Sequence, residues 1–500
     1  MCRTNLQQPE SDNNAIRGGG NGQQRVTDAT KLFNAVIEGR AELWADEENH
    51  GFITFAVNGH REHHPLRGRT VRLWLGGLFY ERFGKALSSQ PLQDALNALE
   101  ARAIFGGAAR HDVHIRTAVL NGAVYLDLGT PGWEVVEITS SGWRVRPGSD
   151  VPVRFRRPDG SRPLPMPSRG GNIARLARFL NTSARGFMFC VAWLLATLRG
   201  QGPFPVLFLN GEQGTGKSLA SEVLRALTDP NKAPTRTPPR DLEGVKVAAF
   251  NSYVAAFDNM SYVPQWLSDA LCRLSTGAGF SDRQLYTDLE EVVFQACRPV
   301  IVNGIPDFIG SPDLAERTLH VTLHPIPPEL RRTKEAFWSE FERECPAILG
   351  GLLTALSGAL ANLPDTNLSE LPRMADLARL MHAAEPFLPW APGAFLSAYT
   401  GSQQEAAQSM VGSDPVGALL ARAVGDGFEG TSAELLREIE PTAGDWRSDR
   451  RFPKGPEGLS HALRRLAPAL RSLGWHVEFG GPKRMITIKP PSQGADHDAE

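Results

Sequence analysis

The feature that most constrains the fold of this chain is a glycine-rich segment between a predicted buried strand and a predicted helix. The apolar run PVLFLN at 205–210 leads into Gly211-Glu-Gln-Gly-Thr-Gly-Lys-Ser218, and SLASEVLRAL then continues with helical spacing. This order of strand, loop and helix is the context in which the pattern G-x-x-x-x-G-K-[ST] binds phosphate. The alternative is a glycine-rich turn that binds nothing, and the flanking pattern argues against it.

Each residue type in this loop suits a phosphate group. The glycines let the backbone bend so that its N–H groups surround phosphate oxygens, and the helix N-terminus adds its positive end. Lys217 supplies a cation to the β- and γ-phosphates, and the Ser218 hydroxyl is a ligand for Mg²⁺. We therefore expect ATP and Mg²⁺ as cofactors, with the nucleotide bound by Gly211, Glu212, Gln213, Gly214, Thr215, Gly216, Lys217 and Ser218.

An acidic residue ends the next apolar run along the chain. SYVAAFDNM, at 252–260, has the pattern of a strand that ends in Asp258 and Asn259. There Asp258 is placed to hold a Mg²⁺-bound water, and the alternative role is to cap a helix. Asn259 occupies the position of the glutamate that usually activates the attacking water. This predicts slow hydrolysis or a base supplied from elsewhere.

Two polar residues on later strands complete the candidate set. RPVIVNGI, at 298–305, is an apolar strand ending in Asn303, which is placed to touch the γ-phosphate or orient water; a turn at Asn-Gly is the alternative. Arg317 begins the following strand, where it can stabilise transition-state charge on a neighbouring subunit's nucleotide, or pair with Asp313 in its own chain. The predicted catalytic residues are Lys217, Asp258, Asn303 and Arg317, and the predicted metal ligands are Ser218 and Asp258.

A hairpin is predicted between these strands. Its arms are RQLYTD at 283–288 and EVVFQA at 291–296. Arg283 and Tyr286 offer one cation and one stacking ring, the combination that grooves for single-stranded nucleic acid use. A purely structural hairpin remains open as the alternative.

Positive charge is local in this chain. The sequence has 53 Lys+Arg and 55 Asp+Glu, for a net charge of -2, so any nucleic-acid surface must be confined to part of it. Residues 141–185 carry ten arginines against two aspartates, and residues 445–490 carry ten basic against four acidic residues. Such stretches can neutralise phosphates. For 141–185, a solvated linker whose arginines pair with neighbouring domains is the alternative.

Cysteine and hydropathy patterns favour a cytoplasmic protein with no membrane partner. Five scattered cysteines without C-x-x-C argue against a disulfide framework and a zinc ribbon. The polar start lacks the apolar core of a signal peptide. The most apolar run, 187–198, has twelve residues, and a bilayer needs about 20. Histidines at 60, 63, 64, 111 and 114 raise a metal site as a hypothesis, which we disfavour because no cysteine lies near them.

The fold class expected is α/β with several domains, since 500 residues exceed one ordinary core. Alternating strands and helices predict a parallel-sheet core, and three helices followed by a hairpin outline a winged helix. The expected segments are a disordered tail at 1–26, an α+β N-terminal domain at 28–158, a basic linker with helices at 159–200, the phosphate-loop ATPase core at 201–327, a helical segment at 328–410, a basic winged-helix-like domain at 412–490 and a tail at 491–500.

Taken in order, GEQGTGKS, AAFDN, R-x-LYTD-x-E-E, RPVIVNGI and DLAERTL resemble the superfamily 3 helicase core. The likeness is strongest to the ATPase module of phage- and plasmid-type primase-helicases of mobile elements, over about 140–390. It implies an AAA+-like core that assembles as a ring, usually hexameric. Lys217 and Ser218 match the first motif, Asp258 the second, Asn303 the sensor and Arg317 the finger, whereas Asn259 departs from the pattern. No primase motif precedes the core, so primase activity is not carried over.

The expected function is Mg²⁺-dependent ATP hydrolysis coupled to translocation on DNA, unwinding or remodelling, with single-stranded or forked DNA as partner. One alternative is a nucleotide-gated regulator that binds DNA and switches state with little unwinding, which Asn259 favours. Another is an assembly ATPase that does not act on nucleic acid, which the basic segments argue against.

Overall fold

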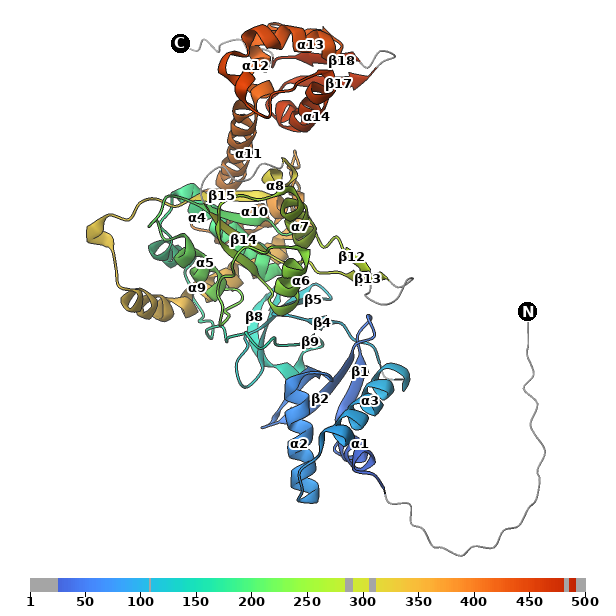
Figure 1. The fold of residues 1–500 in the computed structure, drawn as a ribbon. Helices are drawn as coiled ribbons and strands as arrows, with labels where there is room; N and C mark the ends of the chain where they lie inside the picture. Colours follow the sequence, from blue (N-terminus) through green and yellow to red (C-terminus); the bar gives the residue numbers. More distant parts are fainter. Residues whose placement is uncertain (1–25, 108, 284–290, 305–311, 481–484, 492–500) are drawn as a thin grey trace, which may run out of the picture. The chain divides into compact units, whose positions relative to one another are not determined.

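The computed structural model describes residues 26–107, 109–283, 291–304, 312–480 and 485–491, which form two compact units (Figure 1). One unit comprises the described residues up to Ala56 together with His63–His111. The other comprises Val57–Glu62 and the described residues from Asp112 onward. The division falls inside 28–158, the segment that we expected to form a single N-terminal domain.

The first unit packs three helices with a small sheet. The helices are α1 (Asp28–Glu38), α2 (Arg69–Phe83) and α3 (Ser89–Phe105), and the sheet has the order β1 (Glu42–Ala45), β2 (Gly51–Val57) and β3 (His60–Pro65), of which Val57 and His60–Glu62 are assigned to the second unit. Each helix buries one apolar stripe, with Val36, Leu75 and Leu99 fully enclosed. Trp44 lies in this core and donates its indole N–H to the Thr54 hydroxyl at 2.9 Å.

The second unit begins with an antiparallel meander. Its strands are β5 (Thr117–Leu120), β6 (Ala123–Asp127), β7 (Glu134–Thr139) and β8 (Gly142–Pro147), paired in chain order, while β4 (Val113–His114) pairs with β9 (Arg154–Phe155). Leu126 and Val136 belong to the same apolar core as the long helix α9 (Lys334–Asn362). The meander therefore folds onto the chain that follows it. This shared core explains why the boundary does not fall at residue 158.

A four-stranded parallel sheet forms the centre of the second unit. Its strands are β10 (Val206–Asn210), β11 (Ala255–Met260), β14 (Val300–Gly304) and β15 (Thr318–Thr322), in the spatial order β11-β14-β10-β15. The third strand in sequence is thus inserted between the first two. Because parallel strands end at the same edge, the residues that follow β10, β11 and β14 are brought together.

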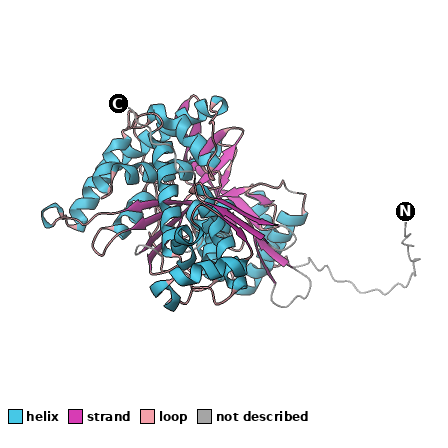
Figure 2. Cartoon of the chain, turned by 90° about the horizontal axis from the view of Figure 1, so that it is seen from above, coloured by secondary structure: helices cyan, strands magenta, loops and turns pink. Residues whose placement is uncertain are grey.

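Alternating side chains of these strands enter two separate cores. Leu207 and Ile301 point to one core and Phe208 and Val302 to the other, as a strand period of two requires. The first core is shared with α4 (Ala184–Arg199), α5 (Lys217–Ala226), α9 and α10 (Ala375–Ala384). The second is shared with α6 (Leu242–Asn251), α7 (Gln265–Thr276) and α8 (Pro312–Glu316). Helices therefore cover both faces of the sheet (Figures 1 and 2).

Among the described residues, one helical stretch, Lys334–Asp365, is long and apolar enough by composition to cross a membrane. Most of its apolar window is buried. Leu349, Leu352 and Leu356 are fully enclosed in the core against the meander and α4. This stretch therefore packs as a core helix of the second unit.

The chain ends in a small domain with its own core. After α11 (Ala394–Ser413) it contains α12 (Pro415–Val424), α13 (Ser432–Ile439) and α14 (Pro456–Ser472), with an antiparallel sheet of β16 (Phe428–Gly430), β18 (Met485–Lys489) and β17 (His476–Gly480) in that order. Thr431 and Glu434 form a reciprocal capping box that starts α13. The predicted three helices and hairpin are present, and β16 adds a third strand.

Candidate nucleotide site

The glycine-rich loop leaves β10 at Asn210 and enters α5 at Lys217. Gly211, Gly214 and Gly216 have φ of +151°, +84° and +86°, values that residues with a Cβ rarely adopt. At Gly211 a Cβ would also lie 2.7 Å from the Leu323 carbonyl oxygen. The loop thus requires glycine at these positions. It places the first N–H groups of α5, which have no partner within the helix, at its opening.

Lys217 is folded back over this loop. Its ammonium donates to the carbonyl oxygens of Gly211 and Glu212, each at 2.7 Å, and the Thr215 hydroxyl donates to Glu212 at 2.9 Å. These bonds hold the cation at the mouth of the loop. A phosphate group entering the loop would meet a positive charge that is already in place.

Ser218 and Asp258 lie together at the carboxyl edge of the sheet. The Ser218 hydroxyl donates to the Asp258 carboxylate at 3.1 Å, across 40 residues of sequence, and the Thr235 hydroxyl approaches the other carboxylate oxygen at 3.4 Å. Hydroxyl and carboxylate oxygens are the donor types that Mg²⁺ prefers. The residues present therefore fit a Mg²⁺ ion held between α5 and β11. Thr235 was not singled out from the sequence, because its segment has no recognisable pattern.

Asn303 is buried at the end of β14 and connects three elements. Its amide donates to the Ser221 hydroxyl of α5 at 3.1 Å, and its carbonyl accepts the Asn259 backbone N–H of β11 at 2.8 Å. Asn259 itself has φ of +60° and lies at a break in register of β11, a conformation that asparagine tolerates better than most residues. Asn303 and Gly304 both lie within strand β14. The alternative that we gave from the sequence, a turn at this Asn-Gly pair, is therefore not what the structure shows.

Arg317 lies at the amino ends of the parallel strands, whereas the glycine-rich loop lies at their carboxyl ends. It directly precedes β15, which runs parallel to β10, and the loop follows the far end of β10. Its guanidinium donates to Asp313 at 3.2 Å, and Arg373 donates to the same carboxylate at 3.0 Å. Burial acts to raise the pKa of Asp313, but the hydrogen bonds from Arg317, the Cys272 thiol and Arg373 outweigh it and hold that pKa below its ordinary value. The intra-chain pair expected as the alternative is thus present, and Arg317 is remote from its own loop.

The hairpin predicted between 283 and 296 is present in part. Strands β12 (Phe280–Arg283) and β13 (Glu291–Phe294) pair antiparallel, with Arg283 opposite Glu291. Arg283 is described for its backbone only, and Tyr286 lies outside the described residues.

The arginines of 141–185 are largely engaged within the chain. Arg144 and Arg146 bind Glu137, Arg157 binds Asp127, Arg175 and Arg178 bind Glu344 and Glu340, and Arg185 binds Glu405. Arg156 and Arg169 stack on the rings of Phe250 and Trp143. The segment therefore fastens the meander and η2 (Ile173–Phe179) to their neighbours, as the linker alternative proposed.

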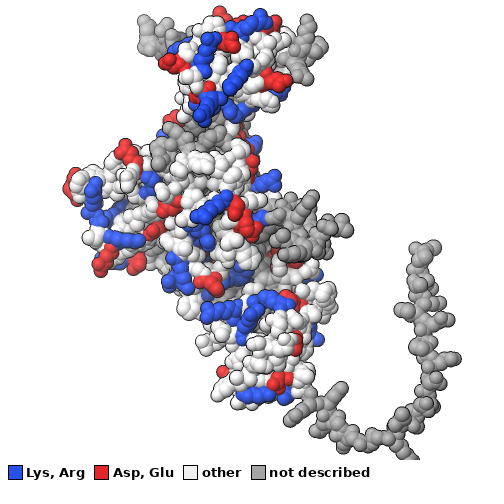
Figure 3. All heavy atoms as spheres, viewed as in Figure 1, with Lys and Arg blue, Asp and Glu red and all other residues white. Residues whose placement is uncertain are grey.

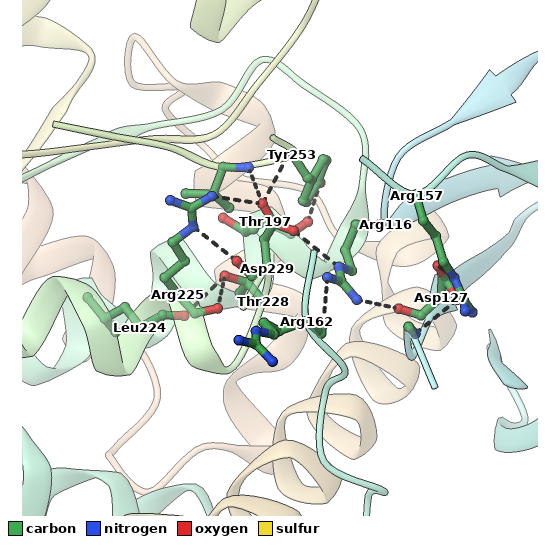
Figure 4. Close-up of polar contacts among 12 residues, drawn as sticks. Arg116, Asp127, Arg157, Arg162, Thr197, Leu224, Arg225, Thr228, Asp229 and Tyr253 are labelled. Atoms are coloured by element: carbon green, nitrogen blue, oxygen red, sulfur yellow. Dashed lines mark hydrogen bonds and ion pairs between the residues drawn. The ribbon is translucent and has the colours of Figure 1, made fainter. Parts of the chain in front are cut away.

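Sequence reasoning missed a buried ionic cluster beneath this site (Figure 4). Asp229, just beyond α5, is 1% exposed and accepts from Arg116 at 3.2 Å and from Arg225 at 3.3 Å. It also accepts the backbone N–H groups of Tyr253 and Val254, which lead into β11. The cluster ties α5, β11 and the meander together. Only the fold brings Arg116 and Asp229 together, since 113 residues separate them.

The histidine metal site, a hypothesis that we disfavoured from the sequence, does not appear among the residues that the structure describes. His63 instead hydrogen-bonds the Thr54 hydroxyl at 2.7 Å. Within those residues, one group has ligand atoms close enough for a metal, Asp46, Glu48 and His50, and it is largely exposed.

Unpaired basic side chains gather on the C-terminal domain. Arg447, Arg450, Lys454, Arg464 and Lys489 are exposed and form no ion pair among the described residues. Arg464 lies over the Phe479 ring at 4.5 Å, beside a cavity of about 650 Å³ at the N-terminal ends of α13 and α14. Figure 3 shows basic side chains on the visible face of this domain, with acidic side chains among them.

Fold and site together define a mixed α/β protein in which a glycine-rich loop and an acidic strand end meet at one edge of a parallel sheet. Residues 171–403 match the family described as actinomycete integrative conjugative element replication protein. Residues 416–498 match the C-terminal domain of the same family. Over these two segments, in this order, the chain is similar to replication proteins of conjugative elements.

Comparison with solved structures gives looser likenesses. Two structures of the apo C-terminal region of NrS-1 align with TM-scores of 0.40 and 0.39 at 12% and 13% identity, covering 92% and 93% of this chain and 99% of each of those chains. JCV helicase aligns with a TM-score of 0.21 at 14% identity, covering 46% of this chain and 66% of that chain. TM-scores of this size are too low to support an argument about function. A search of curated proteins found no match.

Proposed function

We propose that this replication protein is a Mg²⁺-dependent ATPase of the superfamily 3 helicase type. It would use ATP hydrolysis to translocate on, unwind or remodel DNA during replication of a mobile element in the cytoplasm. The observation that carries the proposal is the Ser218–Asp258 contact of 3.1 Å beside the Lys217 loop. That contact joins two motifs which the sequence separates by 40 residues, and the family match supplies the replication context.

The residues of the site have distinct roles in this proposal. Lys217 and the loop N–H groups bind and orient the β- and γ-phosphates. Ser218 and Asp258 hold Mg²⁺, which neutralises charge on the phosphates when it is bound. Asn303 is a positioning residue, because it fixes α5, β11 and β14 relative to one another through bonds of 2.8 and 3.1 Å.

The proposed arginine finger requires a second subunit. Arg317 precedes β15 and the loop follows β10, and because these strands are parallel, the two lie at opposite strand ends in one chain. Each strand has five residues, so the separation is roughly 15 Å at about 3.3 Å per residue. Arg317 can act on a nucleotide only if that nucleotide belongs to a neighbouring chain. We therefore include a homo-oligomeric ring, hexameric by resemblance, in the proposal.

Two substitutions separate binding from turnover at this site. Lys217→Ala should remove most phosphate affinity and turnover, whereas Asp258→Asn should spare nucleotide affinity more than turnover, because metal positioning matters most in the transition state. Lys232→Ala, at an exposed lysine, is the matched control and should change neither. Nucleotide binding by fluorescence and hydrolysis by phosphate release measure the two effects. Wild-type turnover in Lys217→Ala would refute the site.

A nucleotide-gated DNA-binding switch is the second candidate, and Asn259 favours it. An amide cannot take a proton from water as a glutamate does. In the structure the Asn259 backbone N–H is held by Asn303. A switch would bind ATP and change its affinity for DNA without multiple turnovers. Binding without steady-state hydrolysis would favour this function over the motor.

A further inference from the structure

A second cavity lies at the amino edge of the parallel sheet, opposite the phosphate loop. It has a volume of about 320 Å³ and is formed within the second unit. Its lining comes from the β4–β5 segment, the C-terminal ends of α4 and α7, the residue Tyr253 before β11 and the segment 295–298 before β14. The cavity therefore touches the starts of the two strands whose far ends carry Asp258 and Asn303.

Arg298 is the one permanently charged side chain among the described residues that line this cavity. Its Nε donates to the Ala249 carbonyl at 3.0 Å and its Nη1 to the Cys297 carbonyl at 3.1 Å. A guanidinium has five N–H donors in a rigid fork, so donors remain beyond these two bonds. The two backbone bonds fix the position of the fork, and its remaining N–H groups have no hydrogen-bond partner among the described residues.

The charge of Arg298 is not balanced by an ion pair within the described residues. No aspartate or glutamate appears among the lining residues that the structure describes. Burial lowers the pKa of Arg298, and the electrostatic effects of Tyr253, Cys297 and Asp229 oppose that shift only in part. His114 also lines the cavity, and burial lowers its pKa, which favours the neutral ring that can donate one N–H. A partly buried cation without a carboxylate partner is a site for an anion.

We infer that this cavity binds a small molecule that carries an oxyanion, a phosphate or a carboxylate, with Arg298 as its main anchor. The volume accommodates a ligand larger than inorganic phosphate. Because Arg298 lies two residues before β14 and Tyr253 two residues before β11, the ligand contacts the strands that position the candidate nucleotide site. The cavity is separate from the phosphate loop, so its occupancy is measurable without ATP turnover.

Cys297 provides a reporter for occupancy of this cavity. It lines the cavity and is partly exposed, whereas Cys190, Cys272 and Cys345 are buried. Burial raises the pKa of the Cys297 thiol to about 11, so alkylation by iodoacetamide is best followed at about pH 9, where some thiolate is present. The full-length chain carries Cys2→Ser, and mass spectrometry identifies the alkylated residue.

The probes are inorganic phosphate and, in a parallel arm, acetate, each at constant ionic strength set with chloride. At ten times its Kd the bound anion should slow alkylation of Cys297 about tenfold. Protection by phosphate alone would identify a phosphate-bearing ligand, and protection by acetate would extend the site to carboxylates. The effect should persist in Lys217→Ala, where the phosphate loop is impaired. Arg298→Gln should abolish it, and the exposed Arg240→Gln control should not.

An unchanged alkylation rate with both anions would overturn the inference. So would protection that disappears in Lys217→Ala, because the anion would then act from the phosphate loop. If Arg298→Gln does not fold, the protection measured in the chain with an intact Arg298 still decides the question. Loss of ATPase activity does not enter this test, so its outcome is independent of the proposed function.

Discussion

Asp229 shows how a single buried carboxylate supports the candidate site without touching it. Its carboxylate pairs with Arg116 and Arg225. It also accepts two backbone N–H groups from the segment that leads into β11. Removing one partner of such a buried group leaves uncompensated charges, which is strongly destabilising. The cluster fixes the end of α5 relative to the start of β11, and these two elements carry Ser218 and Asp258.

We predict that Asp229→Ala lowers the stability of the second unit by about 3–5 kcal/mol, since Arg116 and Arg225 would stay buried without their carboxylate. Thermal unfolding followed by circular dichroism measures the loss. Asp159→Ala is the control, at an exposed aspartate that should change stability by less than about 0.5 kcal/mol. Equal melting temperatures for the two variants would contradict the role given to Asp229.

At the scale of elements, the position of β14 between β10 and β11 decides which residues meet. The insertion brings Asn303 within hydrogen-bond distance of both α5 and β11. Without it, Asn259 and Ser221 would have no common partner. The strand order also explains why the break in register of β11 occurs at Asn259, where its backbone N–H turns to the Asn303 side chain.

The sequence predicts long elements of this fold well and short ones poorly. The helix after the glycine-rich loop follows from the helical spacing of SLASEVLRAL, and the strands at 206–210 and 255–260 follow from continuous apolar runs that end at polar residues. Strands β1 and β16 have four and three residues, too few to show a period, and each pairs with a longer neighbour, whereas β9 and its partner β4 have two residues each. Likewise the loop motif predicts Lys217 and Ser218, whereas Asp229 has no local signal and depends on tertiary contacts.

The C-terminal domain should bind DNA mainly through its unpaired basic side chains. Because this domain has a hydrophobic core of its own, a fragment of residues 412–490 serves for the test. We predict that its affinity for duplex DNA falls steeply with salt, and that the double variant Arg464→Gln, Lys489→Gln reduces the salt slope by about 2, because each lost phosphate contact contributes about 0.9. Fluorescence anisotropy at several salt concentrations measures the slope. A fragment with no salt-sensitive binding would instead indicate a protein-docking domain.

At the scale of the whole molecule, the position of Arg317 makes a prediction about mixed assemblies. Arg317→Ala should bind ATP and assemble yet hydrolyse it poorly, since arginine fingers contribute roughly 10³ to 10⁵ in rate. Lys217→Ala retains its own Arg317, and Arg317→Ala retains its own Lys217. Mixing the two inactive proteins should therefore restore part of the ATPase activity at interfaces that combine an intact loop with an intact arginine.

Arg373→Ala is the matched control for that experiment. It removes the other cation from Asp313, which Arg373 contacts at 3.0 Å and Arg317 at 3.2 Å, without removing the proposed finger. If Arg317 serves only the intra-chain ion pair, both variants should lower stability similarly, and mixing should rescue nothing. A turnover defect confined to Arg317→Ala, with an unchanged melting temperature, is the result that the finger predicts.

The central claim is that the protein is an ATPase whose hydrolysis is coupled to DNA. The most direct test is steady-state ATP hydrolysis with and without single-stranded DNA. The 500-residue wild-type chain, Lys217→Ala and the exposed-lysine control Lys232→Ala are compared in Mg²⁺. We predict turnover in the wild type and the control that rises when DNA is added, and none above background in Lys217→Ala. Hydrolysis indifferent to DNA, or hydrolysis that survives the loss of Lys217, would contradict the account.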